Sequence, residues 1–104
     1  MIPHILHYCW FGGREIPQNL QVCMSTWHAL MPDWQQMRWD EQTFDVASST
    51  WTHGAYEAKK YAFVSDYVRL VALEQYGGIY LDTDVKLLKS LVPLAEQYGC
   101  FTGY

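Results

Sequence analysis

The chain of 104 residues suits a single domain, and its 7 basic and 11 acidic residues give a formal net charge of −4. Half of the residues are hydrophobic and 16% are aromatic, which excludes an intrinsically disordered protein. The acidic balance and the lack of a basic run disfavour nucleic acid as a partner, and no apolar stretch is long enough to span a membrane.

The first predicted element is a strand over residues 2–11, where apolar residues form a nearly continuous run. Such a run is typical of a strand that is covered on both faces. His4 and His7 interrupt it, and their spacing puts them on opposite faces of a strand. We therefore expect hydrogen-bonded structural histidines rather than metal ligands.

The carboxyl end of this strand carries Trp10 and Phe11, followed by Gly12 and Gly13. An aromatic ring in this place could stack on a nucleobase, or it could cap the hydrophobic core. These residues by themselves favour the core. The glycine pair allows a tight turn or a close approach of the backbone to a ligand.

Residues 17–31 predict a helix that begins near Pro17 and ends at Pro32. Its apolar residues recur at helical spacing and are interpreted as core: Leu20, Cys23, Met24, Trp27, Leu30 and Met31. A second strand is predicted over residues 35–39. Residues 40–54 are polar and predict a loop with at most one turn of helix.

The longest helical pattern runs from Ala55 to Tyr76 and predicts a mostly buried helix. Its central stripe is Val64, Val68, Val71 and Gln75, widened by Phe63, Tyr67 and Leu70. Asp66 and Arg69 lie one helical turn apart on one face, and the simplest interpretation is an exposed ion pair within the helix. Charges on an otherwise apolar helix also indicate a face that opens onto a polar site.

Gly77 and Gly78 end this helix, and a short apolar strand leads into Asp82 and Asp84. In an extended segment, residues two apart point to the same side, with Cα atoms about 6.5 Å apart. Two such carboxylates can converge on Mg²⁺ or Mn²⁺ and share it with substrate phosphates. The carboxyl end of a strand is also where open α/β sheets bind ligands. The alternative is a solvated surface turn, because Asp-x-Asp alone is a weak signal.

An edge strand over residues 85–88 and a helix over residues 91–98 follow, and residues 100–104 begin another strand-like run. A chain rarely ends on an unfinished apolar strand, so we expect the front part of a longer protein. Its open edge should allow self-association into a homo-oligomer. We also expect the isolated 104 residues to show almost no activity if the protein proves to be an enzyme.

The three cysteines, Cys9, Cys23 and Cys100, lack CxxC spacing and predict buried thiols in a reducing compartment. Met1 leads directly into the first strand, without the basic segment or cleavage site of a signal peptide. We expect a cytoplasmic protein, with peripheral attachment to the inner face of the membrane as the alternative.

Three ordered blocks of the sequence carry a family resemblance: Ile2–Gly13 (IPHILHYCWFGG), Ala58–Arg69 (AKKYAFVSDYVR) and Gly77–Asp84 (GGIYLDTD). In these blocks the chain resembles the DXD-containing sugar transferases of glycosyltransferase family 32. That family includes bacterial capsule and polysaccharide enzymes and eukaryotic mannosyl-, galactosyl- and N-acetylglucosaminyltransferases. The clostridial glucosylating toxins are similar in the same blocks.

The resemblance implies a GT-A fold, which is a Rossmann-like α/β fold with a mainly parallel sheet and flanking helices. Residues 1–104 would be its nucleotide-sugar-binding part, without the acceptor-binding part. The implied reaction is a metal-dependent, retaining transfer of a sugar from a nucleotide sugar to a glycan or polysaccharide acceptor. The expected cofactor is Mn²⁺ or Mg²⁺. The expected donor is a uridine diphosphate sugar, with guanosine diphosphate mannose as the alternative.

The resemblance also assigns roles to residues. Trp10 would stack on the nucleobase, and Asp66 and Arg69 would hold the sugar and diphosphate. Asp82 would lie near the ribose and sugar, and Asp84 would bind the metal. The substrate-binding residues implied are Trp10, Phe11, Gly12, Ser65, Asp66, Arg69, Tyr80 and Asp82; the catalytic ones are Arg69, Asp82 and Asp84; the metal ligands are Asp82 and Asp84.

Two other functions remain open from the sequence. A haloacid-dehalogenase-type phosphotransferase also begins its site with an apolar run and Asp-x-Asp, but Lys86 stands where that class has Thr or Val. A non-catalytic nucleotide-sugar-binding protein would carry the same motifs as the enzyme.

Overall fold

The computed structural model describes residues 2–97, so the predicted strand-like run over 100–104 lies outside the described residues. A three-stranded parallel sheet in the order β2-β1-β3 forms the centre of the fold. Its strands are β1 (Ile5–Cys9), β2 (Gln35–Trp39) and β3 (Ile79–Tyr80). The predicted α/β class with a parallel sheet is confirmed.

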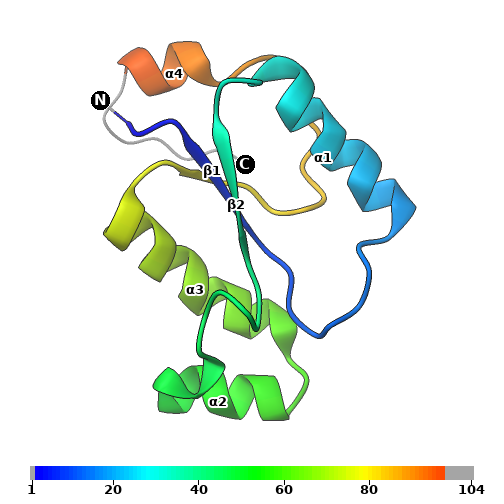
Figure 1. The fold of residues 1–104 in the computed structure, drawn as a ribbon, viewed down its shortest axis with the longest axis vertical. Helices are drawn as coiled ribbons and strands as arrows, with labels where there is room; N and C mark the ends of the chain where they lie inside the picture. The colour runs from blue at the N-terminus through cyan, green and yellow to red at the C-terminus, as the bar shows by residue number, and fades with distance from the viewer. Residues whose placement is uncertain (1, 98–104) are drawn as a thin grey trace.

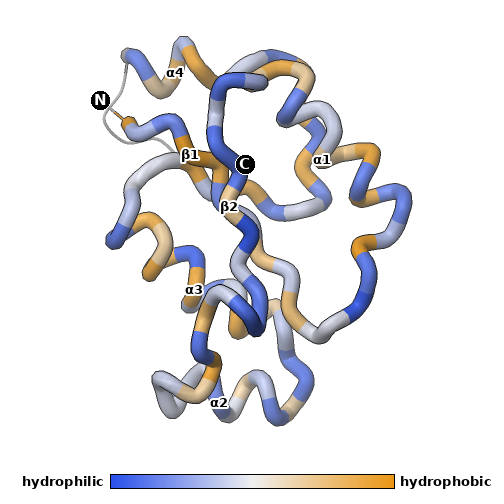
Figure 2. The backbone as a smooth tube through the Cα atoms, viewed as in Figure 1, coloured by the Kyte–Doolittle hydropathy of each residue, from blue (hydrophilic) through white to orange (hydrophobic). Residues whose placement is uncertain are grey.

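Two long helices cover opposite faces of this sheet (Figure 1): α1 (Gln18–Leu30) and α3 (Tyr61–Tyr76). The shorter helices are η1 (Val46–Ser48), α2 (Thr50–Glu57) and α4 (Val92–Gln97). Hydrophobic residues concentrate in β1 and recur at intervals along α1 and α3 (Figure 2), as expected for helices that pack on a sheet with one face. Within residues 2–97, no helix is both long and apolar enough to cross a membrane.

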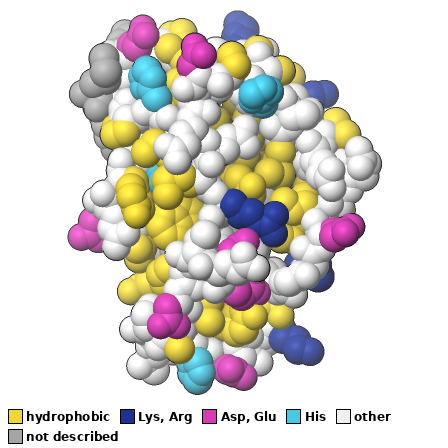
Figure 3. All heavy atoms as spheres, viewed as in Figure 1, with side chains coloured by type: hydrophobic (Ala, Val, Ile, Leu, Met, Phe, Trp, Pro, Cys, Tyr) yellow, Lys and Arg dark blue, Asp and Glu magenta, His cyan; other side chains and the backbone are white. Residues whose placement is uncertain are grey.

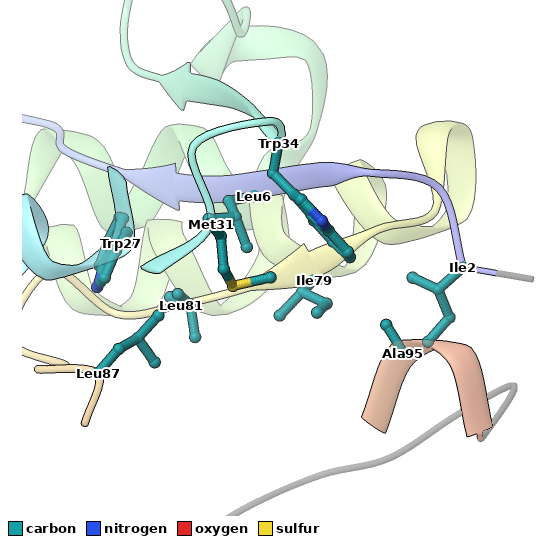
Figure 4. Packing of buried hydrophobic residues seen from close by; sticks show 9 residues of the cluster. All are labelled: Ile2, Leu6, Trp27, Met31, Trp34, Ile79, Leu81, Leu87 and Ala95. Atoms are coloured by element: carbon teal, nitrogen blue, oxygen red, sulfur yellow. The ribbon is translucent and has the colours of Figure 1, made fainter. Parts of the chain in front are cut away.

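The side chains of β1 alternate between two cores. Leu6 and Tyr8 face α1, whereas His7 and Cys9 face α3. The core on the α1 side (Figure 4) consists of Ile2, Leu6, Trp27, Met31, Trp34, Ile79, Leu81, Leu87 and Ala95. The core on the α3 side consists of Cys9, Phe11, Trp39, Val64, Val68 and Ala72. A covered β1 thus explains its nearly continuous apolar sequence.

The predicted helix over residues 55–76 is wrong at its amino-terminal end, because two helices occupy this region. The Ser49 side chain accepts a hydrogen bond from the Thr52 backbone N–H at 3.2 Å and so caps α2, which begins inside the predicted loop. Lys59 then takes a left-handed φ of 60°, which ends α2 and lets α3 start at Tyr61.

The prediction that the long helix is mostly buried is also wrong. Val64, Val68 and Ala72 are fully buried, but Phe63 and Leu70 are 46% and 64% exposed. One helical face alone therefore carries the packing of α3.

The edge strand predicted over residues 85–88 does not form. This segment instead packs along α1, because the Trp27 indole N–H donates to the Val85 carbonyl at 2.8 Å and the Leu87 N–H donates to Thr26 Oγ1 at 2.8 Å.

Candidate functional site

The carboxyl ends of the parallel strands and one face of α3 border an open hollow of about 480 Å³. Eight of the nine site residues predicted from the sequence line this hollow: Trp10, Phe11, Ser65, Asp66, Arg69, Tyr80, Asp82 and Asp84. The ninth, Gly12, follows Phe11 in the sequence. Binding outside the carboxyl ends of the strands is the usual arrangement of open α/β sheets. Residues far apart in the sequence are therefore brought together here.

A larger hollow of about 680 Å³ lies between α1 and β2 and contains none of the predicted site residues. Basic side chains lie over hydrophobic atoms where this face is hollowed (Figure 3). Its lining combines two arginines, Arg14 and Arg38, and one glutamate, Glu15, with the amides of Gln21 and Gln36. Size alone therefore does not make it the better candidate for the site.

The two aspartates lie in a turn rather than in the extended segment that the sequence predicted. The Leu81 N–H donates to the His7 carbonyl at 3.0 Å, which is the last bond between β1 and the β3 segment. The Val85 N–H then donates to the Asp82 carbonyl at 3.0 Å and closes a turn over residues 82–85. Both carboxylates are exposed and line the same hollow.

The predicted pair on α3 is present. Arg69 Nη2 lies 3.4 Å from Asp66 Oδ1, and the two side chains are 44% and 53% exposed. An exposed pair of this kind stabilises a helix by only a few tenths of a kcal/mol. Asp66 and Arg69 can therefore give up this ion pair and bind a ligand instead, at little cost to the stability of the fold.

Adjacent residues at the end of β1 lie in different surroundings. The Phe11 side chain is 2% exposed and belongs to the core on the α3 side, as the core interpretation predicted. Trp10 is half-buried and lines the hollow, and its indole N–H donates to the Arg14 carbonyl at 2.8 Å. Its ring is thus held at the hollow in a defined orientation.

Gly12 shapes the turn next to Trp10. Its φ is +108°, and a Cβ at this position would lie 2.8 Å from the Tyr61 ring, so no other residue fits. Its N–H donates to Glu41 Oε2 at 2.6 Å, and the same oxygen accepts the Tyr56 hydroxyl at 3.0 Å. Sequence reasoning missed Glu41, Tyr56 and Tyr61, and the unusual glycine pair was the one signal of this turn.

Tyr80 supplies a neutral donor beside the aspartates. Burial raises the pKa of Tyr80 far above its usual value, and the neighbouring Cys9 thiol and Asp82 carboxylate raise it further. The phenol therefore keeps its proton at any physiological pH. Burial also raises the pKa of the Cys9 thiol to about 11, so this cysteine is an unreactive core residue.

His7 of β1 is a buried residue that links the end of α3 to β2 through its two ring nitrogens. Its Nε2–H donates to the Gly77 carbonyl at 2.7 Å, and its Nδ1 accepts the Trp39 indole N–H at 3.0 Å. Burial lowers its pKa, which keeps the ring neutral, with one donor and one acceptor. His7 is thus a hydrogen-bonded structural histidine, as predicted, whereas His4 stacks on Trp34 with ring centroids 4.8 Å apart.

The donor set suits a hard cation. Within residues 2–97, no three His, Cys, Asp or Glu side chains cluster as a site made wholly of protein ligands would require. Asp82 and Asp84 alone suit Mg²⁺ or Mn²⁺, which retain water and are completed by substrate phosphates. They do not suit zinc, which takes three or four protein ligands.

Comparison with known proteins gives a family match. Residues 17–101 match the family model described as the glycosyltransferase sugar-binding region containing a DXD motif. The block with Trp10 precedes the matched residues, so the family match does not bear on the role of Trp10.

Three relatives illustrate the similarity. An inositol phosphoceramide mannosyltransferase of Schizosaccharomyces pombe is 33% identical over 89% of this chain and 27% of its own length. A mannosyl phosphorylinositol ceramide synthase of Saccharomyces cerevisiae is 29% identical over 90% of this chain and 25% of its own. An uncharacterized glycosyltransferase of Acanthamoeba polyphaga mimivirus is 29% identical over 100% of this chain and 44% of its own. The chain thus spans less than half the length of these relatives.

Proposed function

This chain belongs to the family of glycosyltransferase sugar-binding regions that contain a DXD motif, of the glycosyltransferase family 32 type, and we propose that it binds the nucleotide-sugar donor for a metal-dependent, retaining sugar transfer. One observation carries the proposal. Asp82 and Asp84, from the turn after β3, line the same hollow as the Asp66–Arg69 pair of α3, at the carboxyl edge of a parallel sheet.

The residues of the hollow suit the bond that must break. The sugar leaves a nucleoside diphosphate when the charge that develops on the diphosphate is stabilised. A divalent cation held by Asp82 and Asp84 supplies Lewis-acid stabilisation of that charge when bound. Arg69 donates charge-assisted hydrogen bonds to the same phosphates or to a sugar hydroxyl, and Asp66 orients it. The two aspartates therefore need not transfer protons.

Trp10 and Tyr80 complete the donor site in this proposal. The half-buried indole offers a ring face on which a nucleobase stacks, and such stacking contributes about 1–3 kcal/mol per base. The Tyr80 phenol is protonated, and its raised pKa only strengthens that state, so it can donate a hydrogen bond to the Asp82 carboxylate.

The identity of the donor's sugar and that of its nucleobase are proposed on different grounds. Uridine diphosphate sugars are the donors that the sequence resemblance predicts. The names of the two yeast relatives support mannose, and hence guanosine diphosphate mannose as the rival donor. For the acceptor, the predicted glycan or polysaccharide has a sphingolipid as its rival, since one relative is named for inositol phosphoceramide and the other for mannosyl phosphorylinositol ceramide.

A thermal-shift screen with UDP-glucose, UDP-galactose and GDP-mannose, each with and without Mn²⁺, tests the proposal and chooses the donor. A donor at a hundred times its dissociation constant stabilises the fold by about 2.7 kcal/mol. We expect one of these donors to raise the melting temperature when Mn²⁺ is present. A protein that none of them stabilises, with or without the metal, would contradict the proposal.

Donor hydrolysis separates the enzyme from a non-catalytic binding protein. An enzyme should release the free sugar slowly from the stabilising donor, and proton NMR should show the donor's anomeric configuration in the first product. Stabilisation without any release would favour the binding protein, and inversion of the anomeric centre would exclude the retaining mechanism.

A further inference from the structure

Arg14 is a charged residue of the hollow to which neither the sequence nor the family match assigns a role. Its guanidinium carbon lies 5.0 Å from the centre of the Trp10 ring and 6.0 Å from that of Tyr61. Its backbone carbonyl accepts the Trp10 indole N–H, so the residue and the ring are tied together at two points. The guanidinium is thus held by aromatic faces at the mouth of the hollow.

The guanidinium of Arg14 has its donors free for a ligand. Within residues 2–97 it makes no ion pair and no hydrogen bond, whereas Arg69 is paired with Asp66 and Arg38 with Asp40. An arginine fork suits bidentate contact with phosphate oxygens. Arg14 is therefore the uncommitted cation of this hollow in the part of the chain that the structure describes.

The net negative charge of the hollow makes a second arginine useful for binding a diphosphate. Its lining contains the carboxylates of Asp66, Asp82 and Asp84 against the guanidinium groups of Arg14 and Arg69, which leaves a net negative lining. A diphosphate adds further negative charge to this site. A divalent cation at the aspartates offsets part of that charge, and Arg14, which lines the same hollow, can offset more.

We propose that Arg14 is a donor-binding residue: it covers the Trp10 ring in the empty site, and it moves onto the diphosphate of the donor when the nucleobase takes its place on that ring. The proposal rests on the donor-binding function proposed above. The exchange is favourable because an exposed cation–π contact is weaker than stacking of a base. Arg14 lines the same hollow as both aspartates, so its side chain borders the space the diphosphate would fill.

Calorimetric titration of the full chain in Mn²⁺ with two ligand series tests this role: uridine, UMP and UDP, and guanosine, GMP and GDP. For the series that binds, we expect Arg14→Met to weaken the diphosphate by about tenfold to a hundredfold, the range for losing a charge-assisted hydrogen bond. Binding of the nucleoside should be unchanged or tighter, because no cation has to leave the ring. Arg14→Lys should recover part of the diphosphate affinity, because it keeps the charge without the planar fork.

Arg38→Met is the matched control, because Arg38 shares the larger hollow with Arg14 but does not line the candidate site, and it is engaged with Asp40. It should leave every affinity unchanged. Equal losses for nucleoside and diphosphate in Arg14→Met would overturn the phosphate contact, and unchanged affinities would overturn the whole inference. A wild-type chain that binds neither UDP nor GDP would instead overturn the proposed function, and this inference with it.

Discussion

At the scale of single residues, neighbours in the sequence divide between core and site. Trp10 and Phe11 follow each other at the end of β1, yet Trp10 lines the hollow and Phe11 is buried under α3. Strand alternation explains the difference, because successive side chains of an extended segment point to opposite sides. The sequence pattern placed both aromatics correctly at the strand end, but it could not say which ring stays partly exposed at the hollow.

Substitution of these two residues should have opposite effects. Trp10→Ala should weaken nucleotide binding by about 1–3 kcal/mol, since a stacking surface is lost. Its melting temperature should change little. Phe11→Ala should lower the free energy of unfolding by about 3–5 kcal/mol, since a core ring is lost. Melting curves and nucleotide titrations on both variants separate a binding role from a core role. A large loss of stability with normal binding in Trp10→Ala would refute the stacking role.

His7 should make the stability of the protein depend on pH. Its pKa is lowered by burial in the folded state, so the unfolded chain binds a proton more readily. Stability should therefore fall as the pH drops below the unfolded value of about 6.5, by at most about 1.4 kcal/mol per pH unit. Urea unfolding between pH 7.5 and pH 5 should show a shallower dependence for His7→Gln. Identical slopes would contradict this origin of the pH dependence.

At the scale of elements, patterns of apolar residues predicted β1, α1, β2 and β3, because each packs one or both faces against the core. The break between α2 and α3 could not be predicted in the same way. Ala58, Lys59 and Lys60 are all good helix formers, and the left-handed turn at Lys59 is closed by backbone hydrogen bonds from Lys59 N–H to the Tyr56 carbonyl and from Lys60 N–H to the Ala55 carbonyl. The strand predicted over 85–88 failed for a related reason, because contacts with α1 prevail over local propensity.

The left-handed turn offers a test at this scale. Lys59→Gly should raise the free energy of unfolding by up to about 1 kcal/mol, because a side chain at a φ of 60° is strained and glycine is not. Lys60→Gly is the control, since Lys60 has a φ of −95° and gains nothing from glycine. Chemical denaturation of both variants measures the difference. A lower stability for Lys59→Gly than for the wild type would contradict the assigned turn.

At the scale of the whole molecule, the hollow forms because three segments of the chain lie at one edge of the parallel sheet: the turn after β1, one face of α3 and the turn after β3. The aspartates and the α3 pair could be predicted from three sequence blocks. The supporting contacts could not be predicted from the sequence. Glu41 accepts a hydrogen bond from Gly12 and Arg14 packs on Tyr61, and these residues are too far apart in the sequence for a local pattern to indicate the contacts.

Self-association, expected from the sequence at the open edge, stays a prediction, and exposed apolar side chains of α3 offer a second surface for it. Phe63 and Leu70, two turns apart on one side of α3, are 46% and 64% exposed, and Trp51 of α2 packs against Phe63. Exposed apolar patches favour association. Light scattering should show a mass that rises with protein concentration, and Leu70→Glu should reduce it without lowering the melting temperature. A monomer at all concentrations in the wild type would refute this prediction.

The central claim is that Asp82 and Asp84 bind the donor through a divalent cation, and one titration tests it most directly. The donor chosen by the thermal-shift screen is titrated calorimetrically into the wild type and into Asp84→Asn, with and without Mn²⁺. We expect Mn²⁺-dependent binding in the wild type and its loss in Asp84→Asn, at an unchanged melting temperature, because the side chain is exposed and contributes little to the fold. Equal, metal-independent donor affinity in the two proteins would contradict the account.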